Sequence, residues 1–289
     1  MLSSTITLAS LALFALAGTA AGGSNTLFTG FSVGKKAVSH NANTFGEQKI
    51  IGGVATSIKN FPYMAAVTMY KGKTYVAQCG GSILDKYHIL SAAHCFDNRN
   101  PKAYYIRVGS DYWRYKGQGS GVKTITVHPK YNKTIFDYDV AVIKLIKPIT
   151  INNRETKATS IVKLNTVTKA DTVITLIGWG YTDALHSKPI PGTVRSVDIA
   201  VTDRSECESD YSDFEKEITP RMICGMTTDG EAKDSCQGDS GGPVINKATK
   251  QQIGIVSWGM GCAQMGSPGV FTNLANPEIR SFINSAIKK

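Results

Sequence analysis

Several features that would mark a membrane protein, a repeat protein or a nucleic-acid-binding protein are missing from this sequence. It has no internal repeat and no low-complexity tract, and no apolar run is long enough to span a bilayer. Basic residues outnumber acidic ones, 32 against 22, but they are scattered and form no run. No recognised nucleic-acid-binding motif accompanies the charge, so we interpret it as a solvated basic surface and expect neither nucleic acid nor a membrane among the partners.

Metal-binding patterns are missing as well. The six cysteines include no Cys-x-x-Cys pair, and the pairing of His94 with Cys95 is too little for a zinc site. We therefore expect no metal and no cofactor. Cysteines without a metal pattern favour disulfides in an oxidising compartment, although the sequence by itself leaves their pairing open.

The chain is long enough, at 289 residues with 42% apolar content, to bury a substantial core in one or two domains. Residues 8–17 form an apolar run that ends in small residues, which predicts a signal peptide over residues 1–21, although no Lys or Arg precedes the run. Residues 22–49 are polar with no sustained apolar period, and we interpret them as a flexible propeptide before a folded domain at 50–289. The protein is therefore expected to be secreted and extracellular.

Two sets of short segments in the folded domain are rich in Val, Ile, Tyr and Thr and are bounded by turn residues, which predicts strands. The first set comprises residues 63–70, 82–84, 88–91, 105–108, 122–127 and 139–145, and the second comprises 173–180, 194–201, 222–225, 244–246, 252–258 and 269–273. No crossover helix fits between them, so we expect an all-β fold of two six-stranded antiparallel barrels with a junction near residues 150–170. Asn276 and Pro277 predict the start of a C-terminal helix.

One stretch, residues 234–243 (DSCQGDSGGP), combines serine, acids and glycines in an order that composition alone does not explain. A serine hydroxyl such as that of Ser240 is a weak nucleophile unless a base lies nearby. Gly238 lets the backbone bend until its N–H and that of Ser240 point at one place, where an oxyanion could form. A tight surface turn is the alternative interpretation.

The partners that such a serine needs occur elsewhere in the chain. The motif Ser91-Ala92-Ala93-His94-Cys95 contains a histidine, and Asp139 stands at the head of an apolar strand. This order of motifs resembles the trypsin-like serine proteases of the chymotrypsin family, and the similarity runs from residue 50 to the C-terminus. We prefer Asp139 to its neighbour Asp137 because Asp139 directly abuts the strand.

The resemblance implies a secreted serine endopeptidase that works through a Ser-His-Asp triad and an acyl-enzyme. His94 would be the base, Asp139 would orient it, and the N–H groups of Gly238 and Ser240 would form the oxyanion hole. The alternative is a non-catalytic or regulatory binding protein on the same fold, because fold alone does not establish activity.

Substrate choice is implied by Asp234, which would lie at the base of the pocket for the side chain before the cut bond. Gly259 and Gly269 match the small residues that keep this pocket open in the family. A desolvated carboxylate there would accept Arg or Lys and reject Phe or Leu. We therefore expect protein and peptide substrates with Arg or Lys before the cut bond, and binding by protein protease inhibitors. A surface turn acid is the alternative for Asp234.

Activation by cleavage is implied as well, so the protein would be made as a zymogen. Cleavage after Lys49 would free the amine of Ile50, which would pair with Asp239 inside the protein. A buried carboxylate without a cation is costly, so the uncut chain would stay inactive. Since Lys49 fits the expected specificity, we hypothesise that the protein activates itself, and activation by another trypsin-like enzyme is the alternative.

The remaining expectations also follow from the resemblance or from short patterns. The implied disulfides are Cys79–Cys95, Cys207–Cys224 and Cys236–Cys262. The stretch 109–121, where many trypsins bind calcium, has the single acid Asp111, which argues against calcium. Asn132-Lys133-Thr134 is a glycosylation sequon. We expect a monomer.

Overall fold

The computed structural model describes residues 52–182, 185–212, 214, 216–228, 234–262, 264 and 266–288. The expected signal peptide, the propeptide and the cleavage site between Lys49 and Ile50 lie outside these residues.

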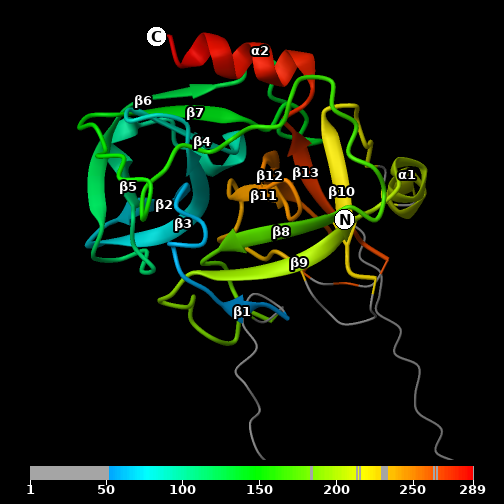
Figure 1. Cartoon of the computed structure of the whole chain (residues 1–289), viewed down its shortest axis with the longest axis horizontal. Coiled ribbons are helices and arrows are strands. Elements are labelled where there is room, and N and C mark those ends of the chain that lie inside the picture. The colour runs from blue at the N-terminus through cyan, green and yellow to red at the C-terminus, as the bar shows by residue number, and fades with distance from the viewer. Residues whose placement is uncertain are drawn as a thin grey trace, which may run out of the picture. The chain divides into compact units, whose positions relative to one another are not determined.

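The first half of the domain is a closed antiparallel barrel with the strand order β2-β3-β4-β7-β6-β5 (Figure 1). Its strands are β2 (Met64–Lys71), β3 (Thr74–Ile83), β4 (His88–Ser91), β5 (Tyr104–Val108), β6 (Gln118–Val127) and β7 (Ala141–Leu145). Two short 3-10 helices, Ala93–Phe96 and Pro101–Ala103, follow β4. Closure leaves this barrel without a free edge strand that could pair with another chain.

The second half is built in the same way. Its strands are β8 (Val173–Gly178), β9 (Arg195–Val201), β10 (Met222–Met226), β11 (Pro243–Asn246), β12 (Gln252–Trp258) and β13 (Gly269–Asn273). They follow one another in the order β9-β10-β13-β12-β11-β8, and β8 pairs back with β9, so this barrel also closes. The short strand β1 (Val54–Ala55) joins it at β9. The predicted all-β fold of two six-stranded antiparallel barrels is confirmed.

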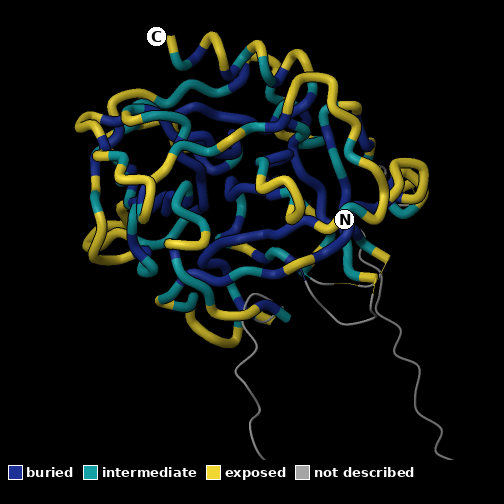
Figure 2. Tube along the Cα trace, viewed as in Figure 1, coloured by how far each residue is buried: buried dark blue, intermediate teal, exposed yellow. Residues whose placement is uncertain are grey.

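Alternating burial explains why these segments form barrels. In β5, Tyr104, Ile106 and Val108 are buried while Tyr105 and Arg107 point outward, as the two-residue period of a strand requires. Side chains from both barrels also contribute to one continuous hydrophobic cluster. In Figure 2 the dark blue buried segments follow the strands, and most exposed segments are turns and the outer face of the C-terminal helix.

Two α-helices occur in the described part of the chain. The predicted C-terminal helix is α2 (Pro277–Ala286), in which Ile279, Ile283 and Ala286 are buried. The other helix, α1 (Arg204–Ser212), was not predicted, because its sequence is polar and only Cys207 and Tyr211 are buried. Neither helix has the length and apolar character that crossing a membrane requires.

Strand β3 is longer than the sequence predicted. We expected a strand only at residues 82–84, whereas β3 begins at Thr74 and pairs with β2 along its length. Gly80 and Gly81 lower the intrinsic strand preference of this segment, but pairing within the barrel overrides it.

The N-terminal cap of α2 gives a first testable prediction. The Asn276 side chain accepts hydrogen bonds from the N–H groups of Glu278 and Ile279. Substitution Asn276→Ala should therefore lower the free energy of unfolding by about 1 kcal/mol in urea titrations. Asn284→Ala, at an exposed position in the same helix, is the matched control and should not destabilise. Equal effects of the two substitutions would contradict the capping role.

Candidate active site

Except for Asp139, the residues predicted for catalysis, the oxyanion hole and substrate binding line one cleft of about 770 Å³, to which both barrels contribute. The first barrel contributes residues of β2 and β3, together with His94 and Phe136 from its loops. The second barrel contributes the 234–238 stretch, Ser240, and residues at and beyond the end of β12. Residues separated by more than a hundred positions in the sequence therefore share one surface.

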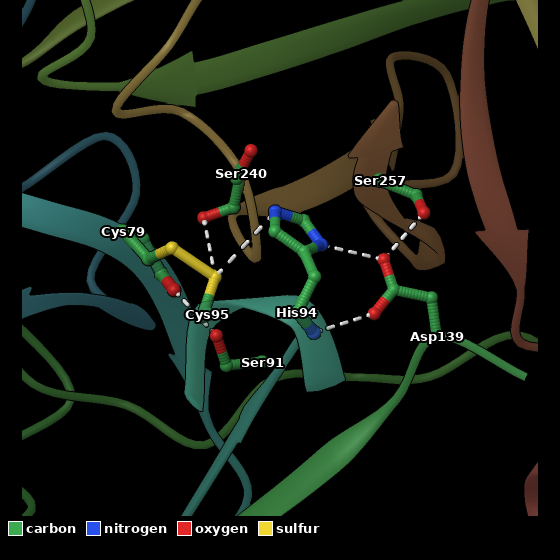
Figure 3. Close-up of a disulfide and its surroundings, with 8 residues drawn as sticks. Cys79, Ser91, His94, Cys95, Asp139, Ser240 and Ser257 are labelled. Atoms are coloured by element: carbon green, nitrogen blue, oxygen red, sulfur yellow. Dashed lines mark hydrogen bonds and ion pairs between the residues drawn. A yellow bond between two sulfur atoms is a disulfide. The ribbon is translucent and has the colours of Figure 1, made fainter. Parts of the chain in front are cut away.

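His94 in this cleft is bonded to Asp139 behind it through two contacts (Figure 3). The His94 Nδ1 atom lies 2.7 Å from Asp139 Oδ2, and the backbone N–H of His94 donates to Asp139 Oδ1 at 2.9 Å. The carboxylate is completely buried, whereas the imidazole is 19% exposed. Two bonds from one residue fix the ring orientation and leave Nε2 as the ring nitrogen without a bond to the carboxylate.

Ser257 is a site residue that the sequence analysis missed. Its hydroxyl donates a hydrogen bond of 2.5 Å to Asp139 Oδ2, and the Thr272 hydroxyl donates to the Asp139 carbonyl oxygen at 2.7 Å. Both residues belong to strands of the second barrel, β12 and β13. Ser257 lies two residues before Gly259, but nothing in a serine's sequence context shows that it faces an acid.

Ser240 is held beside His94 by contacts with the first barrel. The Gly80 N–H donates to the Ser240 carbonyl oxygen at 2.8 Å, and Cys95 Sγ lies 3.7 Å from that oxygen and 3.9 Å from His94 Nε2. Ser240 and His94 both lie in the described part of the chain, and Ser240 Oγ forms no hydrogen bond with the His94 ring. Catalytic hydrogen bonds are often long without substrate and tighten only when it binds.

The backbone around Ser240 has the bend that Gly238 was expected to permit. Gly238 has φ +101°, and a Cβ atom there would lie 2.9 Å from the Gly180 Cα atom, so only glycine fits. Within the described residues, the N–H groups of Gly238 and Ser240 have no hydrogen-bond partner. Two free donors beside a hydroxyl are what an oxyanion would require.

Asp234 lines the same cleft and is almost buried, with 7% of its surface exposed. Its Oδ1 atom accepts the N–H of Ser235 at 2.7 Å. A Cβ atom on Gly269 would lie 3.1 Å from this oxygen, and one on Gly259 would have no protein atom closer than 3.8 Å. A side chain at Gly269 would therefore lie against the carboxylate, and one at Gly259 would take up space in the same cleft.

Asp239 points away from the cleft into the second barrel. Its carboxylate accepts the N–H groups of Gly180 at 2.7 Å and Cys236 at 3.0 Å. Burial raises its pKa to about 7, despite these two hydrogen bonds, and the charge of Asp234 adds to the rise. Its expected partner Ile50 lies outside the described residues.

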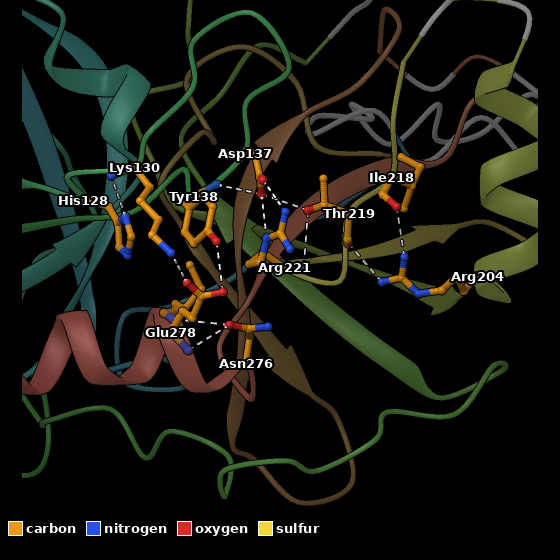
Figure 4. Close-up of polar contacts among 11 residues, drawn as sticks. His128, Lys130, Asp137, Tyr138, Arg204, Ile218, Thr219, Arg221, Asn276 and Glu278 are labelled. Carbon is orange, nitrogen blue, oxygen red and sulfur yellow. Dashed lines mark hydrogen bonds and ion pairs between the residues drawn. The ribbon is translucent and has the colours of Figure 1, made fainter.

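Asp137, the rival of Asp139 in the sequence, is engaged elsewhere (Figure 4). It forms an ion pair with Arg221 and accepts the Thr219 hydroxyl at 2.8 Å. Burial raises the pKa of this carboxyl, but the hydrogen bonds from Arg221 and Thr219, the charge of Arg221 and the Tyr138 N–H together lower it by more. The geometry therefore favours Asp139 as the partner of His94. Asp137 instead bonds the loop that precedes Asp139 to the second barrel.

The three implied disulfides are all present, Cys79–Cys95, Cys207–Cys224 and Cys236–Cys262. Two clusters in the described residues have metal-ligand types close together, one around His94 and one around His186. Each contains two cysteines that are joined in a disulfide, so neither cluster offers thiolates to a metal. Asn132 of the sequon is exposed, with its side chain accepting the N–H of Thr134.

The charge state of His94 depends on burial and on three neighbouring residues. Burial lowers the pKa of the ring, but the charge and hydrogen bond of Asp139, together with Asp97, raise it by more, while Lys133 lowers it. The pKa therefore lies above the ordinary histidine value. Asp97 and Lys133 form an exposed ion pair, so their effects on the ring partly cancel.

This balance predicts opposite shifts from two surface substitutions. Asp97→Asn should lower the pKa of His94, because it removes an attractive charge, and Lys133→Gln should raise it. The midpoint can be followed by NMR titration of the His94 ring in Ser240→Ala protein. Shifts in the same direction for both variants would contradict the assignment.

Comparison with known proteins agrees with this geometry. The family model described as trypsin matches residues 50–283. Trypsin alpha-4 of Lucilia cuprina is 35% identical over 239 residues, which cover 82% of this chain and 87% of the relative. Hypodermin-B of Hypoderma lineatum is 36% identical, covering 83% and 88%, and a vitellin-degrading protease of Bombyx mori is 34% identical, covering 87% and 91%. The chain therefore belongs to the trypsin family and is a trypsin-like serine endopeptidase, a hydrolase of protein and peptide substrates.

Proposed function

We propose that this protein is a secreted endopeptidase, made as a zymogen, that cuts after Arg and Lys through a triad of Ser240, His94 and Asp139. The observation that carries the proposal is the 2.7 Å contact between His94 Nδ1 and the buried Asp139 carboxylate, because His94 lines the same cleft as Ser240 and Asp234. A hydroxyl, a base and an orienting acid in one cleft form the arrangement that activates serine for acyl transfer.

In the proposed reaction His94 Nε2 takes the proton of Ser240 Oγ as that oxygen attacks the substrate carbonyl carbon. Asp139 accepts the Nδ1–H of the imidazolium and stabilises its charge. His94 then gives the proton to the leaving amine, and the acyl group stays on Ser240. A water molecule, deprotonated by His94, releases the acid product and restores the serine.

Two features support catalysis beyond the triad. The free N–H groups of Gly238 and Ser240 would donate to the oxyanion as charge develops on it, and loss of one such donor costs about 2.7–4 kcal/mol in other proteases. Ser257 holds the Asp139 carboxylate from the other barrel, so that the acid stays fixed while the imidazole changes charge.

Specificity is assigned to Asp234. The carboxylate is nearly buried in the cleft, and the two glycines beside it leave space for a long side chain. An arginine or lysine would pair with this charge, whereas an apolar side chain would desolvate it without compensation.

Activation is assigned to Asp239 and to cleavage after Lys49. A carboxyl whose pKa is raised by burial favours a cation as partner, and the amine of Ile50 would supply one. The proposal also includes secretion, autoactivation and glycosylation at Asn132.

The specificity proposal is tested by peptide hydrolysis. Protein beginning at Ile50 should prefer Arg and Lys over Phe before the cut bond, and Ser240→Ala should abolish turnover. Asp234→Ser should lower kcat/KM for Arg and Lys substrates by about 100-fold or more, because the substrate cation loses its partner. Asp171→Asn, which neutralises an exposed acid outside the cleft, is the matched control.

Absence of turnover in correctly processed protein would instead favour the non-catalytic binding protein. Unchanged preference in Asp234→Ser would overturn the role of Asp234 alone.

The activation proposal is tested by Asp239→Asn. Protein cut after Lys49, as verified by N-terminal sequencing, should lose at least about 100-fold in kcat/KM, because the buried amine would have no counter-ion. Full activity of this variant would contradict the ion pair. Precursor carrying Ser240→Ala should fail to convert without another protease, and normal conversion would refute autoactivation.

A further inference from the structure

The outer face of the first barrel carries a cluster of tyrosines and arginines that the proposed mechanism does not use. We call it the tyrosine-arginine groove, and it is lined by Thr68, Thr74, Tyr75, Tyr105, Arg107, Trp113 and Arg114. Its volume is about 530 Å³. β2 lies between β3 and β5, so outward-facing residues of three adjacent strands meet there (Figure 1).

Two tyrosine rings of the groove form a row with Tyr70, which lies next to the groove. Tyr70 and Tyr75 face each other across β2 and β3 with their ring centres 5.4 Å apart, and Tyr75 lies 5.7 Å from Tyr105. Tyr70 and Tyr75 are 49% and 41% exposed. Exposed rings packed against one another lose little freedom when a ligand covers them, which favours binding.

The ring of Tyr105 packs directly over Gly119 on β6. A Cβ atom at Gly119 would lie 2.3 Å from the Tyr105 hydroxyl oxygen and 2.6 Å from its Cε1 atom. The ring therefore occupies the space that any other residue would fill. The row of tyrosines is thus built into the barrel surface.

The two arginines of the groove are also held in place. Arg107 Nη1 donates to the Lys116 carbonyl oxygen at 2.6 Å, and the Arg114 guanidinium lies 4.5 Å from the Trp113 ring centre. Trp113 is itself buried, with its indole N–H on the Pro191 carbonyl. A guanidinium has five N–H donors, so each arginine keeps donors for a ligand.

The charge around the groove has one sign. The segments that form it, residues 68–75, 104–107 and 113–118, contain Lys71, Lys73, Arg107, Arg114 and Lys116 and no Asp or Glu. The nearest acid in sequence, Asp111, accepts hydrogen bonds from Ser57 and the Ile58 N–H. Arginine forks match carboxylates with two parallel hydrogen bonds, so an anionic partner fits.

The groove and the active-site cleft meet at the β2–β3 hairpin. Lys71 lines the cleft, and Thr74, its pairing partner on β3, lines the groove. A chain that leaves the cleft past Lys71 would therefore pass onto the tyrosine row. The lining has more rings and hydroxyls than cations, which suits a peptide with both acidic and apolar side chains better than a polyanionic glycan.

We propose that the tyrosine-arginine groove is a second recognition site, outside the cleft, that binds an acidic segment of a protein substrate. Aromatic side chains of the segment would stack on Tyr75 and Tyr105, and its carboxylates would bind Arg107 and Arg114. The inference rests on the proposed protease function, since the groove would select among substrates that the cleft already accepts.

The test measures binding without turnover, so that its failure is distinct from failure of the protease proposal. The protein is the Ser240→Ala variant, and the probe is a fluorescent peptide of about a dozen Glu, Asp and Phe residues, without Lys or Arg, in about 50 mM NaCl. Arg107→Glu combined with Arg114→Glu should weaken binding by about tenfold or more. Lys163→Glu combined with Lys169→Glu changes the net charge equally at exposed positions outside the groove and should have less than about a twofold effect.

A third variant separates stacking from charge. Tyr75→Ala removes one ring and no charge, and it should weaken binding by about threefold or more. Urea midpoints verify that each variant folds, and Arg107→Gln with Arg114→Gln replaces the double variant if it does not. The proposal is overturned by no binding, by equal loss in both charge-reversed variants, by no effect of Tyr75→Ala, or by groove-dependent binding of a heparin fragment but not of the peptide.

Discussion

The buried carboxylate of Asp139 is the group on which the site depends. It receives the Nδ1 contact and the backbone N–H of His94 from the first barrel, and the Ser257 hydroxyl from the second. An unpaired carboxylate in this position would be costly, so these donors must all be in place. Because they come from both barrels, the orientation of the imidazole is established only when the two halves pack together.

Other contacts around the cleft also depend on the packing of the two barrels. The Gly80 N–H of β3 holds the Ser240 carbonyl, and Asp137 pairs with Arg221 across the halves of the domain. The Cys79–Cys95 disulfide joins β3 to the segment that carries His94. These contacts fix backbone and side chains on both sides of the cleft, so substrate would meet a site that is already arranged. Preorganised donors and charges are the main source of electrostatic stabilisation in such sites.

Asp239 and Asp234 are close in sequence but lie in different environments. Asp239 is buried among backbone N–H groups with its pKa raised to about 7, whereas Asp234 lines the cleft beside two glycines. In the proposed function, the first would pair with an internal cation and the second with a substrate cation. The tyrosine-arginine groove adds a surface of opposite charge, so the enzyme would meet cations in its pocket and anions on its outer face.

The sequence by itself determined the general architecture and led to the proposed chemistry. Motif order pointed to His94, Asp139 and Ser240, segments rich in Val, Ile, Tyr and Thr predicted both barrels, and glycine at position 238 anticipated its left-handed backbone, because these features depend on local residue type and spacing. Only the tertiary structure decided five other features: the contact of Ser257 with Asp139, the role of Asp137, helix α1, the length of β3 and the tyrosine row over Gly119. Each depends on contacts between residues distant in sequence, and a polar or glycine residue carries no local sign of what it will face.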